Sequence, residues 1–143
     1  MPDVASLCKV AAAAAWQAAF DENRPFEATI VLADDVLVRS LNREYRNQDK
    51  STNVLSFSYS ENQFIIPDDV PTLGDIIIAF ETTKSEAPNN LSNQLSHLVV
   101  HGCLHLLGFD HEDEKEAEKM EGMEIDILAG LKIADPYSQV SEV

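Results

Sequence analysis

The sequence has few cysteines, glycines and prolines, and it contains no long apolar run. Its two cysteines, Cys8 and Cys103, lie far apart and form no Cys-x-x-Cys pair, which favours reduced, buried thiols in a cytosolic protein over a disulfide framework. No low-complexity tract is present, so we expect disorder only in a flexible tail over about residues 135–143. The apolar N-terminus lacks a basic start and the ~20 apolar residues of a membrane span, so we expect a cytoplasmic protein without membrane contact.

Basic residues are also scarce, since 10 lysines and arginines stand against 25 acids and the net charge is −15. This balance argues against broad nucleic-acid binding, which relies on positive charge to attract phosphate. Nine of the acids lie between Asp110 and Asp126, where we expect a solvent-facing helix surface that would repel RNA. Three arginines, Arg39, Arg43 and Arg46, share one face of a predicted helix over 35–46. That basic stripe is either a solvated helix face or a local RNA-binding surface.

The hydrophobic pattern predicts one α/β (α+β) domain over residues 1–143, with a small mixed β-sheet covered by helices. Strands are predicted at 26–33, 53–59 and 73–80, the last buried on both faces. Helices are predicted within 1–20 and over 35–46, 91–107 and 112–131, with 81–90 as a connecting segment. Apolar residues surround the helix at 91–107, so it should be central and buried, and Gly108 should end it with a positive φ. The predicted core positions of the first two helices are Val4, Leu7, Cys8, Ala11, Ala15, Leu37, Val38, Leu41 and Tyr45.

The stretch HGCLHLLGFDH, residues 101–111, contains three of the four histidines. His101 and His105 lie four residues apart on the predicted helix, about 6 Å along its axis, which is a spacing that lets two imidazoles bind one cation. The turn at Gly108 can bring His111 back to the pair. Three imidazoles would form an open tripod that leaves a coordination position for water. The alternative is hydrogen-bonded core histidines, but burying several unpaired imidazoles in an apolar helix is costly. We therefore predict a metal centre.

Other residues near this motif are predicted to have lesser roles. His97 lies ~12 Å along the axis from His105, so we expect it on a pocket wall or at the surface. Cys103 points away from His101 and is expected to pack in the core. Asp110 either caps the last helix or accepts a hydrogen bond from a histidine ring.

The spacing H-x3-H-x2-G-x2-H resembles the signature of metzincin proteases. In those enzymes a glutamate follows the first histidine and activates the zinc-bound water. In this sequence Gly102 occupies that position. The ligand pattern is thus retained without the protease base, and peptide hydrolysis by that route is disfavoured.

The same stretch resembles more closely the YbeY family of bacterial metal-dependent endoribonucleases. The segments LNREYRNQDKSTNVLSF (41–57) and LGDIIIA (73–79) are similar to two further motifs of that family, in the same order. The resemblance implies a zincin-like fold, a metal site at His101, His105 and His111, and a functional arginine at Arg46. It also implies action on ribosomal RNA of the small subunit, in 3′-end maturation of 16S rRNA and in ribosome quality control, together with protein partners of ribosome maturation and no role on DNA.

These observations combine into one mechanistic hypothesis. One divalent ion per chain, zinc first and nickel or cobalt as alternatives, is expected to polarise a phosphoryl oxygen or to lower the pKa of bound water to about 7. Arg46 would stabilise the charge that develops, while Arg39, Arg43 and Lys50 would hold the RNA backbone. Three alternatives stay open: a metalloprotease, a noncatalytic ribosome assembly factor stabilised by its metal, and a metal-dependent hydrolase of a small substrate.

Overall fold

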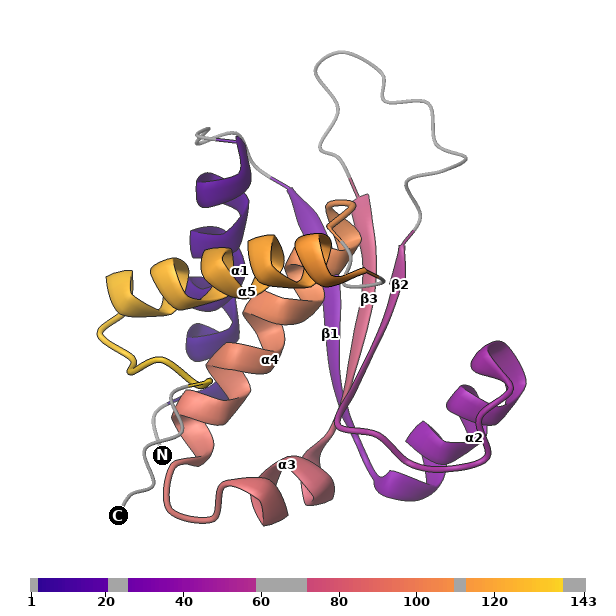
Figure 1. Cartoon of the computed structure of the whole chain (residues 1–143). Coiled ribbons are helices and arrows are strands. Elements are labelled where there is room, and N and C mark those ends of the chain that lie inside the picture. The colour runs from indigo at the N-terminus through magenta and orange to yellow at the C-terminus, as the bar shows by residue number, and fades with distance from the viewer. Residues whose placement is uncertain (1–2, 21–25, 59–71, 110–112, 138–143) are drawn as a thin grey trace.

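A computed structural model describes residues 3–20, 26–58, 72–109 and 113–137 of the chain. Figure 1 shows three strands at the centre, with helices α1, α4 and α5 on one side and α2 on the other. The elements in chain order are α1 (Val4–Phe20), β1 (Glu27–Ala33), α2 (Asp35–Arg46), β2 (Val54–Ser58), β3 (Thr72–Ala79), α3 (Phe80–Glu86), α4 (Leu91–Leu106) and α5 (Glu114–Gly130).

The sheet has the order β1-β3-β2, with β3 parallel to β1 and antiparallel to β2. Ile76 and Ile78 in β3 are fully buried, and Ile77 between them is 9% exposed. Because successive side chains of a strand point to opposite faces, this burial means that both faces of the sheet are covered. The predicted mixed sheet and the doubly buried strand are confirmed.

Two hydrophobic cores lie on the two faces of the sheet. The larger one joins α1, α4 and α5 to Ile76 and Ile78, and the smaller one joins Val38 of α2 to Ile77 and Leu55. Burying one such aliphatic side chain contributes about 1.5–3 kcal/mol. Helix α4 contributes Cys103 and six aliphatic side chains to the larger core, namely Leu95, Leu98, Val99, Val100, Leu104 and Leu106. The prediction of a central, buried α4 is therefore confirmed.

Helix α2 has the bounds that the sequence predicts, because local signals mark both of its ends. The side chain of Asp34 accepts a hydrogen bond from the backbone N–H of Leu37, and Asn47 ends the helix with a φ of 57°. The predicted core face was partly wrong. Val38 is buried, but Leu37 and Tyr45 are 46% and 60% exposed. The smaller core is too small to cover the whole predicted apolar face of α2.

Helix α1 packs on α4 through Cys8, Ala11 and Ala15, which are buried as predicted, and through Ala12 and Trp16. Val4 and Leu7 at its start are only partly buried. Small alanine side chains allow the two helix backbones to approach closely. Within the part of the chain that the structure describes, no helix has the length and apolar character needed to cross a membrane.

Helix α3 was predicted as a connecting segment, and this was wrong. Its seven residues carry no clear periodicity, so tertiary contacts decide its conformation. Glu81 accepts a hydrogen bond from the backbone N–H of Asp35, and Thr82 donates one to the Asp35 carboxylate. The buried Thr83 donates to the carbonyl of Ala79. The two bonds to Asp35 hold the short helix against the start of α2.

Gly102 and Gly108 have different structural roles in α4. A Cβ at Gly102 would lie 2.9 Å from Cγ2 of Ile76, so the absence of a side chain there lets α4 approach β3. Gly108 has a φ of 103° and lies just beyond the helix, where the N–H of Phe109 donates to the carbonyl of Leu104. The predicted helix end is thus confirmed.

The close approach at Gly102 predicts opposite effects for the same substitution at two helical glycines. Gly102→Ala forces a methyl group against a stiff isoleucine, and overpacking of this kind costs about 1–3 kcal/mol, more than the gain in helix propensity. Gly122→Ala in α5 meets no atom within 4 Å and should raise the free energy of unfolding by about 0.5–1 kcal/mol. Denaturant unfolding of both variants measures the difference. Equal stabilisation by both substitutions would contradict the tight contact.

Candidate metal centre

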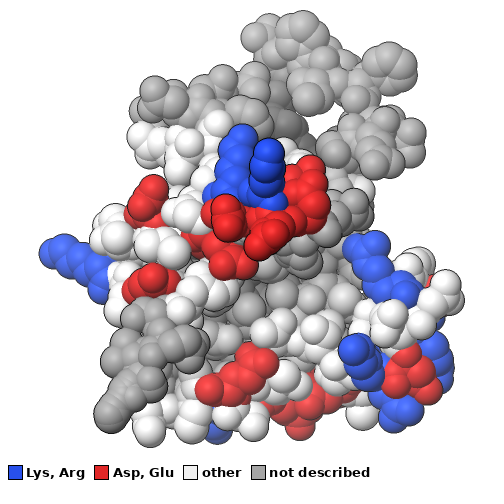
Figure 2. Space-filling view, viewed as in Figure 1, with Lys and Arg blue, Asp and Glu red and all other residues white. Residues whose placement is uncertain are grey.

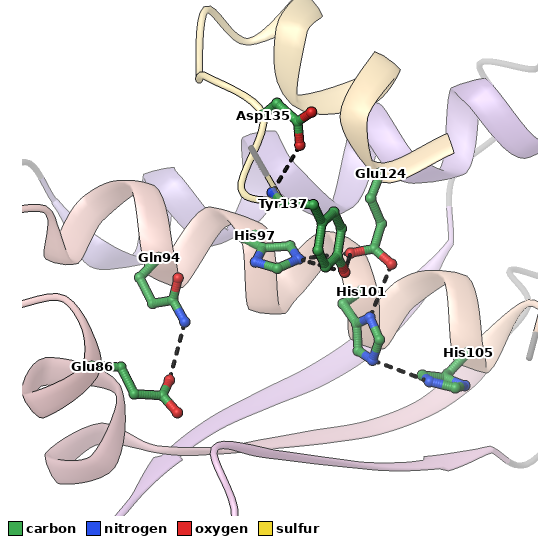
Figure 3. A network of polar contacts seen from close by, with 8 residues as sticks. All are labelled: Glu86, Gln94, His97, His101, His105, Glu124, Asp135 and Tyr137. Carbon is green, nitrogen blue, oxygen red and sulfur yellow. Dashed lines mark hydrogen bonds and ion pairs between the residues drawn. The ribbon is translucent and has the colours of Figure 1, made fainter. Parts of the chain in front are cut away.

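Helix α4 presents three histidines, each one turn after the previous one. His97, His101 and His105 are spaced four residues apart, so their side chains follow one side of the helix. The opposite side, with Gly102 and Cys103, packs into the core. Figure 3 shows the rings of His97 and His101 next to Glu124 of α5, with the ring of His105 on the other side of His101.

His101 and His105 are brought together as the spacing predicts. Their Nε2 atoms lie 3.2 Å apart, and the ring centroids are separated by 4.6 Å. Both residues are partly exposed, and the side chain of His101 is 21% accessible. The third predicted ligand, His111, lies outside the described residues, as does Asp110. The backbone N–H of Glu116 is capped by Asp113 instead, so Asp113 is the N-cap of α5.

Glu124 of α5 joins the histidines in one polar network. Glu124 is fully buried, and its two carboxylate oxygens have different partners. Oε1 lies 2.6 Å from Nε2 of His97, and Oε2 lies 3.0 Å from Nδ1 of His101. The carboxylate therefore bridges two successive turns of α4 at the point where α5 crosses it (Figure 3).

Tyr137 completes this network from the segment that follows α5. Its hydroxyl donates to Oε1 of Glu124 at 2.7 Å, and its backbone N–H is held by the carboxylate of Asp135. The ring also lies edge-on to His97, with 5.4 Å between centroids. The expected flexible tail thus includes a residue, Tyr137, with defined contacts, while residues 138–143 lie outside the described part.

The network controls the charge of Glu124. Burial by itself disfavours the carboxylate, but the hydrogen bonds from His101, His97 and Tyr137 outweigh it and lower the pKa of Glu124 to about 2. Burial and the adjacent carboxylate raise the pKa of the Tyr137 hydroxyl. Glu124 is therefore an acceptor at neutral pH, with Tyr137 as one of its donors.

The group formed by His97, His101 and Glu124 could bind a metal ion. One ligand atom from each lies within 4.8 Å of the others. The alternative that His97 lies at the surface was wrong, because its side chain is only 13% exposed and bonds Glu124, whereas its place on a pocket wall stays a prediction. Its Nδ1 is buried and has no hydrogen-bond partner among the described residues.

The sequence carried a signal for Glu124 that the acidic composition of its helix concealed. Most acids of α5 face solvent, as expected for the acidic run. Glu124, however, follows Met120 by four residues and precedes Leu128 by four, and both of these are buried. An acid on the apolar stripe of an amphipathic helix must have polar partners, and the histidine stripe of α4 supplies them.

Arg46, the predicted functional arginine, is the last residue of α2 and contacts β2. Its guanidinium donates to the backbone carbonyl of Ser56 at 2.7 Å and lies 5.0 Å from the ring centroid of Phe57. Because β2 is an edge strand in the described sheet, this carbonyl has no neighbouring strand on its outer side. Arg46 is thus held at the edge of the sheet by Ser56 and Phe57 of β2, which are not part of the histidine group.

The basic stripe remains on the surface around α2. Arg39 forms a two-pronged ion pair with Asp49, at 2.8 and 3.3 Å, while Arg43 and Lys50 are exposed. Figure 2 shows lysine and arginine side chains gathered at the corner that α2 occupies in Figure 1, interleaved with acids. This corner lies apart from the acidic side chains over α5. Figure 2 also shows basic side chains beside the acids over α5, where Lys115 and Lys119 are exposed, so among the described residues α2 is not alone in presenting positive charge.

Comparisons with known proteins cover nearly the whole chain. A family model described as "Endoribonuclease YbeY" matches residues 4–132. A protein of that name from Azorhizobium caulinodans is 49% identical, with 99% of this chain and 91% of the relative covered. One from Paramagnetospirillum magneticum is 46% identical, with 97% and 88% covered. A solution structure of a Thermotoga maritima protein matches with a TM-score of 0.52 at 23% identity, over 96% of this chain and 91% of that one, which shows similarity of fold alone.

Proposed function

The chain belongs to the YbeY endoribonuclease family, and from this premise we propose that it is a metal-dependent endoribonuclease of ribosomal RNA. The resemblance predicted from three sequence motifs is thereby confirmed. We further propose that it cuts single-stranded RNA in 3′-end maturation of 16S rRNA and in ribosome quality control, in the cytoplasm. The observation that supports the chemistry most directly is the pair of imidazole nitrogens on α4.

We propose that His101, His105 and His111 hold one zinc ion. Zinc–nitrogen bonds of about 2.0–2.1 Å in a tetrahedral arrangement separate two ligand nitrogens by about 3.3 Å. The 3.2 Å between the Nε2 atoms of His101 and His105 fits this requirement. Partial exposure of both rings is consistent with access for a substrate. Nickel or cobalt would accept the same donor set.

The bound ion would supply electrophilic polarisation of a phosphodiester and a nucleophile for its cleavage. Arg46 would donate to the phosphate oxygens, because a guanidinium offers two parallel N–H groups to an anion. Strand β2 would connect Arg46 to the histidines, because Ser58 at the end of that strand contacts the carbonyl of Leu106, the residue after His105. An RNA segment lying along this strand would reach both groups.

The basic surface supports a path for the RNA backbone. Arg43 and Lys50 are exposed near Arg46 and would contact phosphates directly. Arg39 would first have to exchange its ion pair with Asp49, so its contribution should be smaller. Acidic side chains over α5 would keep RNA away from that part of the surface (Figure 2).

The competing protease hypothesis lacks a base at the expected position. Gly102 follows His101, and a Cβ added there would already lie 2.9 Å from Cγ2 of Ile76, which leaves no space for a glutamate side chain. The carboxylate of Glu124 lies near His101, but it is buried and accepts hydrogen bonds from three donors. Nothing in this arrangement favours a peptide substrate.

The proposed activity predicts a clear substrate preference. Purified protein with stoichiometric zinc should cleave single-stranded RNA and leave a peptide pool intact. Removal of zinc by a chelator should abolish cleavage, and added zinc should restore it. Gel analysis of labelled RNA and mass spectrometry of the peptides give the two results. Peptide cleavage without RNA cleavage would contradict the proposal, and so would RNA cleavage that survives complete zinc removal.

A further inference from the structure

We infer that Glu124 is a positioning residue of the metal centre, which holds the ring of His101 so that its Nε2 faces His105. The inference rests on the proposed function, because it assumes that His101 is a ligand. Glu124 reaches the ring from a different helix, α5, and contacts the nitrogen that is turned away from His105. The two nitrogens of His101 therefore have separate tasks.

The hydrogen bond at Nδ1 determines the tautomer of His101. An ionised carboxylate only accepts hydrogen bonds, so the ring must carry its proton on Nδ1 to bond Oε2 of Glu124. In a neutral imidazole this leaves the lone pair on Nε2, the atom that lies 3.2 Å from Nε2 of His105. A carboxylate behind a metal-bound histidine has the further effect of making the ligand nitrogen more basic.

The geometry distinguishes this role from direct ligation by Glu124. Two ligand atoms on one zinc ion lie about 3.3 Å apart, whereas Glu124 is 2.6 Å from His97 and 3.0 Å from His101. These are lengths of charge-assisted hydrogen bonds, with a proton between the atoms. The carboxylate is also fully buried, whereas His101 and His105 are partly exposed, so an ion between the two histidines is better placed to meet a substrate.

His97 and Tyr137 hold Glu124 in place through its other oxygen. Both contact Oε1, from α4 and from the segment after α5 respectively. With Oε1 bound by these two groups, rotation of the carboxylate is restricted and Oε2 stays directed at His101 (Figure 3). This gives His97 and Tyr137 a supporting role behind the ligand.

Zinc titration of purified full-length variants, without RNA, tests the inference. Glu124→Leu keeps an apolar side chain of similar size in the core but removes the acceptor, and zinc affinity should fall about 10–100-fold. Glu124→Gln keeps one acceptor oxygen and should recover part of the loss. Tyr137→Phe removes only a hydroxyl and should weaken binding about two- to tenfold. Glu118→Leu, on the exposed side of α5, is the matched control and should bind zinc as the wild type does.

Nitrogen-15 spectra of the histidine rings supply a second readout that activity does not affect. The metal-free wild type should show His101 protonated at Nδ1, and Glu124→Leu should show the proton distributed over both nitrogens.

Wild-type zinc affinity in Glu124→Leu and Tyr137→Phe would overturn the inference. Complete loss of zinc in Glu124→Gln, equal to that in His101→Ala, would also overturn it and make Glu124 a ligand. Because the titration contains no RNA, a protein that binds zinc but cuts no RNA contradicts the proposed function alone.

Discussion

Replacement of His105 by alanine is expected to remove stoichiometric zinc and to lower RNA cleavage more than about 100-fold, because loss of a ligand should exceed the effect of losing a group that only hydrogen-bonds a ligand, about 10–100-fold. His105 supplies one of the two nitrogens that lie 3.2 Å apart, and its loss leaves a pair of ligands that cannot hold an ion tightly. The side chain is partly exposed, so folding should persist. Metal analysis of the purified variant and cleavage of labelled RNA measure the two effects.

The control for this substitution is Asn93→Ala, on the same helix and outside the histidine network. It should retain both zinc and activity. Circular dichroism of both metal-free variants checks that the helical fold is kept. Retention of one zinc ion by His105→Ala, together with its loss in His97→Gln, would contradict the proposed ligand set. The ion would then belong to the group of His97, His101 and Glu124.

Replacement of Arg46 by alanine should leave zinc content unchanged and lower RNA cleavage about 10²–10³-fold, as the loss of one donor to a developing oxyanion does. Arg46 is exposed, so its bond to Ser56 contributes only about 0.5–1.5 kcal/mol to stability. Arg46→Lys should restore little, because an ammonium group lacks the two-pronged geometry of a guanidinium. Single-turnover cleavage with zinc-loaded protein separates this effect from metal loss.

Lys84→Ala in α3 is the matched control, since it removes an exposed positive charge away from β2. Its cleavage rate should equal that of the wild type. Undiminished cleavage by Arg46→Ala would contradict the proposed role of the arginine. Undiminished ribosomal RNA maturation in cells that carry Arg46→Ala would favour the noncatalytic assembly factor instead.

Much of the fold could be predicted because it depends on local signals. Asp34 caps the start of α2 with its side chain, and Asn47 ends the helix with a left-handed backbone conformation. Both signals involve only residues that are close in the sequence. The consecutive isoleucines of β3 place apolar side chains on both faces of the strand, and such a strand is stable only in a sheet whose two faces are both covered. Helix α3 has no such local signal, and its hydrogen bonds to Asp35 come from a distant part of the chain.

The candidate site divides in the same way. The sequence by itself determined that His101 and His105 would meet, because two residues spaced four apart on a helix have their side chains on the same face, whatever surrounds them. It also carried the family motifs. Only the tertiary structure decided that Glu124 is buried behind His101, that His97 supports it, and that Arg46 lies at the edge of β2. The crossing of α5 over α4 and the packing of α2 on the sheet bring these groups together, and no local pattern determines the position of one helix on another.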